Sequence, residues 1–347
     1  MNKGKTCFYL TLAALLLICI SCQSKIISIP LKINDSNNLI LITKYGESQC
    51  NLTLLPLDDY CSNVITQTDN QLSVCGAQLI GENTFIGGKQ YVAKFQLGDT
   101  QADLNFTNPD QKSSYMGEQA LCFSKKDSKS QDNVIDELFN QKLIKNKRFF
   151  VNVESIDAEK GIIGSIDIGS PNLSLIKKGM KLVNLRHYDE NDDFSTPSDH
   201  SLKYGDLQFK FGSAAGFDLL SPYISFGQNQ LNAILQEIRN DGVKFDYHVD
   251  YANIENYIFN VDSIEKLKDI SFNLITENYT SFKMTIKPQH YTRKLKTGDY
   301  QVLIYPEAYT DYIGLGYSVL QAYYLGYEIP SQSYIIAEKG ENRIEQI

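Results

Sequence analysis

The stretch "AGFDLLSPYISF", residues 215–226, begins with a short apolar segment that reads as a β-strand and ends at an aspartate. Asp218 is followed directly by Leu219 and Leu220, so neither a hydroxyl group nor a glycine stands beside it. An aspartate after a strand can serve simply as a turn or capping residue. The organisation of the rest of the chain therefore decides how Asp218 is interpreted.

Similar short apolar or alternating segments recur along most of the chain, with Gly, Asn and Asp between them. This pattern predicts a mainly β protein. The expected strands are residues 25–33, 39–43, 90–97, 149–153, 162–168, 207–211, 270–274, 282–286, 301–305 and 333–337. Helical spacing is found in residues 134–144, with Asn133 as the N-cap, in 228–238 and in 317–325. Residues 111–133 and 187–202 are polar and are predicted to be loops.

The first 24 residues differ from the rest. Lys3 and Lys5 precede an apolar run at residues 8–20, and small or polar residues follow it. This pattern is typical of a secretory signal peptide, since a membrane anchor needs roughly 20 apolar residues. We therefore expect the chain in the secretory lumen or outside the cell, with a vacuole or lysosome as further destinations. No later run is apolar enough to span a membrane.

Length and charge set further limits. A chain of 347 residues, 42% of them hydrophobic, is long enough for two folding units. The leader pattern predicts a signal peptide at 1–24. A turn-rich join at residues 169–172 divides the rest into two predicted lobes, 25–170 and 171–347. Removing the two leader lysines takes the formal net charge from −8 to −10, which makes nucleic acid an unsuitable partner.

The mature chain keeps four cysteines, Cys50, Cys61, Cys75 and Cys122. An even number in a secreted chain predicts two disulfides, and the sequence leaves their pairing open. Five glycosylation sequons are present, at Asn34, Asn51, Asn105, Asn172 and Asn278. The four histidines, His187, His200, His248 and His290, lack the spacing of metal ligands, so we expect neither a metal nor a cofactor.

Several segments together resemble the pepsin family of aspartic peptidases. They are "NVIDELFNQKLIKNKRFFVNV" (133–153), "GIIGSIDIG" (161–169), "NVDSIEKLKDISFNL" (260–274), "IKPQHY" (286–291) and "GLGYSVLQAYYLGYE" (314–328). The resemblance implies a bilobal pepsin-like acid protease fold, with two β-barrel-like lobes and a cleft between them. It also implies a monomer that takes a peptide or protein in this interlobe cleft.

In the frame of this family, Asp218 takes the place of the second catalytic aspartate. Counting back from residues 54–56, which look like the segment after the first catalytic aspartate, places Glu47 at the first-lobe position. Aspartic proteolysis needs two carboxyl groups that share one proton, held by a neighbouring hydroxyl and a glycine. Leu219 and Leu220 supply neither, and the mature chain has no Asp-Thr-Gly or Asp-Ser-Gly.

The resemblance also bears on the flap and the cysteines. It places the flap near residues 81–88, without the tyrosine expected at its tip. Cys61 and Cys75 flank a loop in which the family often has a short disulfide. The family's second-lobe disulfide would lie near Val261 and residues 300–305, and cysteines are absent from both places.

The sequence therefore predicts a secreted homologue of the aspartic peptidases that has lost catalysis and binds a peptide or protein in its cleft. One alternative is an acid endopeptidase that uses Asp218 with Glu47 or another first-lobe carboxylate. A second alternative is a surface or matrix glycoprotein with no cleft function.

Overall fold

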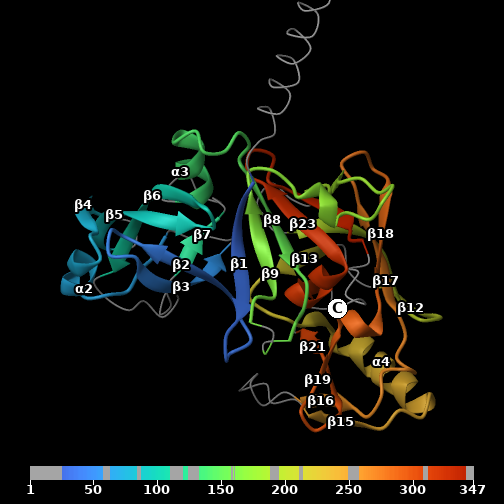
Figure 1. Ribbon diagram of the computed structural model, residues 1–347. Coiled ribbons are helices and arrows are strands. Elements are labelled where there is room, and N and C mark those ends of the chain that lie inside the picture. The colour runs from blue at the N-terminus through green and yellow to red at the C-terminus, as the bar shows by residue number, and fades with distance from the viewer. Residues whose placement is uncertain are drawn as a thin grey trace, which may run out of the picture.

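The computed structural model describes residues 26–57, 63–83, 87–109, 120–123, 133–157, 159, 161–187, 195–210, 214–248, 258–307 and 312–340. They form a mainly β molecule with two lobes, joined by strands from both halves of the chain (Figure 1). The predicted signal peptide lies outside these residues. Within them, no helix is long and apolar enough to cross a membrane.

The first half of the chain contributes most of a twelve-stranded sheet. Its strands are β1 (Ile27–Ile33), β2 (Leu39–Tyr45), β3 (Cys50–Leu57), β4 (Gln78–Glu82), β5 (Gly88–Leu97), β6 (Thr100–Pro109), β7 (Ala120–Cys122), β8 (Arg148–Val153) and β9 (Gly164–Ile168). Two short helices, α2 (Asp69–Val74) and α3 (Val134–Asn140), interrupt them.

The second half forms an eight-stranded and a four-stranded sheet and completes the large one. Its strands are β10 (Val183–Asn184), β11 (Ser195–Tyr204), β12 (Leu207–Lys210), β13 (Ala214–Asp218), β14 (Ile224–Gly227), β15 (Phe245–His248), β16 (Ile258–Val261), β17 (Ile270–Ile275), β18 (Ser281–Ile286), β19 (Thr292–Lys294), β20 (Tyr300–Val302), β21 (Ile304–Glu307), β22 (Tyr312–Gly316), β23 (Tyr323–Glu328) and β24 (Ser333–Glu338). The helical segments are η2 (Leu173–Leu175), α4 (Gln228–Asn240), η4 (Pro288–His290) and η5 (Tyr317–Gln321).

Strands from the two ends of the chain meet in the large sheet, in the order β10-β24-β23-β8-β9-β1-β2-β3-β7. β1 alternates buried and exposed positions, and Ile27, Ile29 and Leu31 are completely buried. A strand with one buried face has its register fixed, because a one-residue slip would turn its apolar side chains to solvent. β1 therefore pairs with β9 in a fixed register. β8 then pairs with β23 from the second half of the chain.

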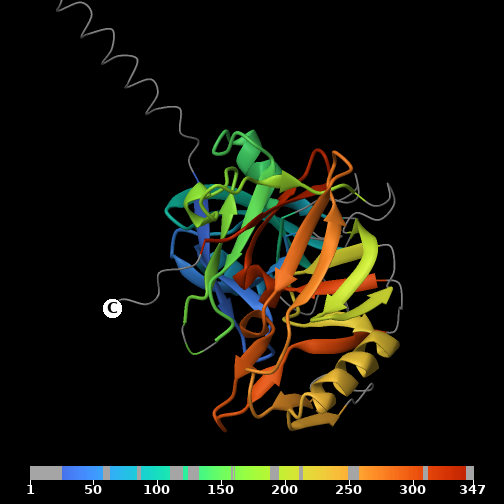
Figure 2. The ribbon, with the colours of Figure 1, turned by 90° about the vertical axis from the view of Figure 1, so that its right-hand side faces the viewer.

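The second lobe carries its main helix on the outside. In α4, Leu231, Ile234, Leu235 and Ile238 are buried, at the spacing that places them on one helix face. This face contacts β14 and β21, and Figure 2 shows α4 along the lower edge of the lobe. The helix thus supports the strand that follows the Asp218 loop.

Most of the strands predicted from sequence are present, and so is the cap of α3. The Asn133 side chain accepts a hydrogen bond from the Asp136 N–H at 2.8 Å. The predicted helix at residues 317–325 is wrong: a 3-10 turn ends at Gln321, and β23 begins at Tyr323. β23 is buried on both faces, and a continuous apolar run cannot distinguish such a strand from a helix.

The predicted loop at residues 187–202 is also partly wrong, because β11 begins at Ser195. Its sequence is polar, yet β11 pairs with β13 on one side and with β17 on the other. Strand pairing here overrides the weak local preference of the sequence.

One disulfide joins Cys50 to Cys75, 25 residues apart. This corrects the pairing implied by the family, in which Cys75 would have bonded Cys61. Cys122 is also disulfide-bonded, to a partner outside the described residues, where Cys61 also lies. In the second lobe, Val261 lies opposite Tyr300 in the β16–β20 pair. The two positions that lack the family's cysteines are therefore cross-strand neighbours.

Candidate cleft site around Asp218

Asp218 ends β13, which runs parallel to β22 with Gly216 opposite Gly314 and Asp218 opposite Gly316. The chain then turns and returns as β14, which pairs antiparallel with the same strand, with Ser225 opposite Gly314. β22 is therefore held between a strand that leads to Asp218 and a strand that leaves it. The sequence alone indicated the aspartate, but not this arrangement.

The first lobe repeats the arrangement. β3 runs parallel to β7 with Leu55 opposite Ala120, and Val64 returns antiparallel to Ala120. The two partners of Ala120, Leu55 and Val64, are nine positions apart in the sequence. Gly216 and Ser225, the two partners of Gly314, are also nine positions apart. When the two registers are matched, Leu57, the last residue of β3, corresponds to Asp218. The next residue in the sequence is Asp58, which lies outside the described residues.

Glu47 lies elsewhere. It is exposed in the turn between β2 and β3, at the opposite end of β3 from Leu57. Eight strand residues separate the two ends, roughly 25 Å at the usual rise per residue. The structure does not bring Glu47 to the position that corresponds to Asp218. The count from residues 54–56 failed because these residues belong to the strand before the expected aspartate, not to the segment after it.

The Asp218 carboxyl group organises its own loop. Its Oδ1 accepts hydrogen bonds from the N–H groups of Leu220, at 2.8 Å, and Ser221, at 3.2 Å. The side chain is exposed to water, yet surrounding protein desolvates it, and this desolvation raises the pKa of Asp218 against the two hydrogen bonds, which lower it.

The two leucines after Asp218 have different surroundings. Leu219 is buried in the core, with 3% of its surface exposed, and Leu220 is half-buried. Neither side chain can donate the hydrogen bond that a threonine or serine would give to a carboxylate. Among the described residues, no hydrogen bond or ion pair joins Asp218 to a second carboxyl group.

Gly316 lets β22 pass close beneath the loop. A Cβ atom there would lie 2.4 Å from the Tyr223 carbonyl oxygen and 2.5 Å from that of Ser221. The Gly316 N–H donates to the Tyr223 carbonyl at 3.0 Å, and the Tyr317 N–H donates to Ser221 at 2.8 Å. Only a glycine fits this approach, which fixes the backbone on both sides of Asp218.

Tyr317 connects this loop to the first lobe. Its buried hydroxyl donates to the Asn37 carbonyl, in the turn between β1 and β2, at 2.7 Å. Burial raises the pKa of Tyr317, and the charge of Asp218 raises it further, so the phenol stays neutral and available as a donor. Arg293 also donates to the Asn37 side chain. Polar contacts from one turn thus couple the lobes beside Asp218.

The flap predicted near residues 81–88 falls on the turn of the β4–β5 hairpin. Among the described strands, β4 pairs with β5 alone, and Leu79 and Ile80 are 59% and 50% exposed. The hairpin therefore presents apolar side chains on an exposed strand.

The predicted glycosylation sites are distributed over both lobes. Asn51 and Asn278 are exposed, whereas Asn34, Asn105 and Asn172 are half-buried. The threonine of the Asn105 sequon, Thr107, is completely buried. Within the part of the chain that the structure describes, His, Cys, Asp and Glu side chains form no group of three or more that could hold a metal ion.

The chain belongs to the eukaryotic aspartyl protease family, whose match covers residues 79–339. This match includes Asp218 and most of the β4–β5 hairpin, and it begins after β3. No curated protein matches the chain. Members of this family bind peptide substrates in the cleft between their lobes, and they are typically secreted or lysosomal.

Proposed function

We propose that this protein binds an extended peptide or protein segment in the interlobe cleft without cleaving it. The observation that carries the proposal is the Asp218 loop, in which the backbone frame of the family is kept while Leu219 and Leu220 replace the groups that hold a catalytic dyad. Within the described residues Asp218 has no carboxyl partner at hydrogen-bond distance, and a single carboxyl group cannot divide the acid and base roles of proteolysis. The apolar surface of Leu220 and the exposed flap hairpin favour contacts with side chains of a bound segment.

The first experiment measures cleavage of an unfolded protein substrate from pH 2 to 7. We expect no cleavage by the wild type or by Asp218→Asn. Binding is then measured with a displayed library of extended peptides, selected on the wild type. We expect Leu220→Lys to weaken the selected peptides at least tenfold. Ile258→Lys is the matched control, because Ile258 is an apolar residue of the same lobe with 42% of its surface exposed.

Two results contradict the proposal. Cleavage that disappears in Asp218→Asn would show that the protein is a peptidase. A folded protein that selects no peptide, or whose peptides bind equally well to Leu220→Lys, would show that the cleft does not recognise extended segments.

A second candidate is an acid endopeptidase with an altered dyad. It is favoured by the geometry of Asp218, whose Oδ1 is held by the Leu220 N–H while the carboxyl remains open to water. Asp58 follows Leu57, the residue that the register of β3 matches to Asp218, and is therefore the first-lobe carboxylate to test in place of Glu47. For this candidate, Asp58→Asn and Asp218→Asn should each abolish acid cleavage, whereas Glu47→Gln should leave it unchanged.

We also propose that the chain enters the secretory route as a monomeric glycoprotein with residues 1–24 removed. The leader pattern supports this, and so does the secreted or lysosomal location that is typical of the family. Peptide mapping after enzymatic glycan removal should find Asn51 and Asn278 modified, because both are exposed. A heavily glycosylated protein without peptide binding would favour a surface or matrix role instead.

A further inference from the structure

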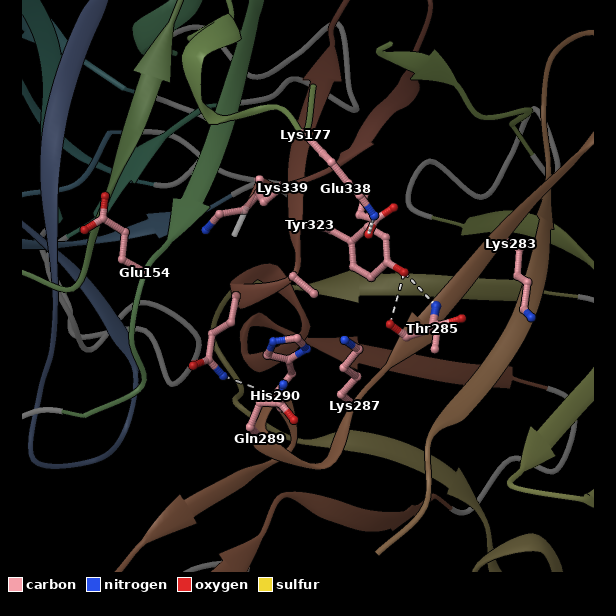
Figure 3. Close-up of a pocket in the computed structure, with 13 residues that line it drawn as sticks. Glu154, Lys177, Lys283, Thr285, Lys287, Gln289, His290, Tyr323, Glu338 and Lys339 are labelled. Atoms are coloured by element: carbon pink, nitrogen blue, oxygen red, sulfur yellow. Dashed lines mark hydrogen bonds and ion pairs between the residues drawn. The ribbon is translucent and has the colours of Figure 1, made fainter. Parts of the chain in front are cut away.

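A cavity of about 600 Å³ lies apart from the Asp218 loop. Its walls come from β18, η4, η5, β23 and the end of β24, together with Glu154 and Lys177 (Figure 3). Thr285 and Tyr323 are hydrogen-bonded to each other within it. Such a volume is in the range of sites for small organic molecules.

The cavity is basic although the protein is acidic. Four lysines line it, Lys177, Lys283, Lys287 and Lys339, against two glutamates, Glu154 and Glu338. The formal net charge of the whole chain is −8. Four of its 33 cationic residues therefore gather around one hollow, where they outnumber the acidic groups by two. A hollow lined by one sign of charge concentrates ligands of the opposite sign.

The lysines differ in what they contact. Lys177 forms an ion pair with Glu338 at the upper edge of the cavity in Figure 3. Lys283 and Lys287 are exposed, and within the described residues neither takes part in a salt bridge. They follow each other at a spacing of four along β18 and its end, so they lie on the same side of the strand. These two ammonium groups are available to a ligand.

Lys339 is held rigidly at the opposite wall. Its side chain is 6% exposed, and its Nζ donates to the carbonyl oxygens of Val153, at 2.7 Å, and Leu320, at 3.2 Å. An ammonium group has three donors, so these two contacts leave one more. Burial lowers the pKa of Lys339 to about 8, and it still carries its charge near neutrality.

His290 lines the cavity, and its pKa responds to the charges around it. Burial, with smaller contributions from the charges of Lys287 and Lys339, lowers the pKa of His290 to about 4. Both lysines therefore act on the same point. The buried Nδ1 of His290 makes no hydrogen bond within the part of the chain that the structure describes. The charges of the two lysines disfavour a further cation at this point.

We propose that this cavity binds a small phosphate-bearing anion, with Lys283 and Lys287 as its exposed contacts and Lys339 as its fixed one. Compact ammonium charges suit the several oxygens of a phosphate group. The volume exceeds that of phosphate alone, so the ligand is a phosphate ester with a polar organic part, which Gln289 and Gln321 can contact. The same chemistry is offered by a free phosphorylated metabolite and by the headgroup of a phosphoinositide lipid.

The test uses inorganic pyrophosphate as the soluble probe, measured by calorimetry on the full protein at low salt. Vesicles of phosphatidylcholine, with and without phosphatidylinositol phosphate, are tested in parallel by co-sedimentation. The double variant Lys283→Gln/Lys287→Gln should weaken binding at least tenfold. The matched control is Lys203→Gln/Lys210→Gln, which removes the same charge from exposed positions of β11 and β12 in the same lobe. It should change binding less than twofold.

Pyrophosphate binding that depends on Lys283 and Lys287 supports a soluble ligand. Vesicle binding with the same dependence, and no pyrophosphate binding, supports a lipid headgroup. The proposal is overturned if the wild type binds neither probe, or if the two double variants lose affinity equally, since the effect would then come from net charge alone. Substitution of these exposed residues leaves the core untouched, and a thermal melt of each variant verifies that it folds.

Discussion

His290 should make the fold sensitive to mild acid. Burial lowers the pKa of His290 to about 4, whereas an unfolded chain has a value of about 6.5. The unfolded state therefore binds more protons than the folded state between these pH values. Stability must fall as pH decreases through this window, because protons favour the state that binds them more strongly. Well above pH 6.5 the imidazole is neutral in both states and contributes no pH dependence.

The magnitude follows from the difference between the two pKa values. A difference of about 2.5 units corresponds to about 3.4 kcal/mol when the pH is well below 4. At pH 5 the unfolded histidine is almost fully protonated and the folded one is almost fully neutral, and the loss is about 2 kcal/mol. This is a large part of the stability of an ordinary domain.

Urea unfolding at pH 7 and pH 5 measures this effect in the wild type and in His290→Gln. Other groups can titrate in this range too, so the informative quantity is the difference between the two proteins. The wild type should lose about 2 kcal/mol more than His290→Gln between the two pH values. The matched control is His248→Gln, because His248 is exposed on β15. It should lose as much stability as the wild type does.

The reasoning fails if His290→Gln and the wild type lose the same stability from pH 7 to pH 5. That result would mean that the folded protein protonates His290 as easily as the unfolded chain does. A direct measurement by NMR would then find the His290 imidazole titrating near pH 6.5.

Three further predictions concern the frame of the fold. Cys75→Ser should lower the free energy of unfolding by about 3 kcal/mol, because it opens a loop closed over 25 residues; urea unfolding under oxidising conditions measures this. Gly316→Ala should lower it by about 3 kcal/mol, since the new Cβ meets two backbone carbonyls, and an unchanged melting temperature would contradict the close approach. Tyr317→Phe should lower it by about 1 kcal/mol through loss of the hydrogen bond to Asn37, and hydrogen exchange should show faster opening at the β1–β2 turn.

Several strands of the second lobe could be predicted because local signals agree there. The apolar runs of β17 and β18 alternate clearly, and each is bounded by turn residues. Val261 and residues 300–305 were matched to a family disulfide from sequence, and β16 and β20 do place Val261 beside Tyr300. A strand whose register is fixed by a buried face leaves its pattern in the sequence.

The first-lobe site could not be placed because its register depends on long-range pairing. β7 has three residues, and β3 shows no Asp-Thr-Gly to mark its end. Residues 54–56 look like the segment after a catalytic aspartate, but pairing with Ala120 and its neighbours makes them the strand before it. The local sequence does not show which distant strand a residue pairs with. The position inferred from sequence, Glu47, is therefore ten residues from Leu57, although nothing in the local pattern contradicts it.

The acid sensitivity of His290 also bears on the choice between the two candidate functions. A dyad of carboxyl groups that shares one proton works best in acid, where one of the pair stays protonated. Over that range the buried imidazole opposes folding, because burial, with smaller contributions from the charges of Lys287 and Lys339, disfavours its protonated form. A bound anion would relieve this opposition, since it would stabilise the imidazolium form. The contribution of His290 therefore favours the folded state most near neutral pH, which fits a protein that binds in its cleft better than one that cleaves in acid. If acid proteolysis is nevertheless found, an occupied basic cavity is the condition under which it should be strongest.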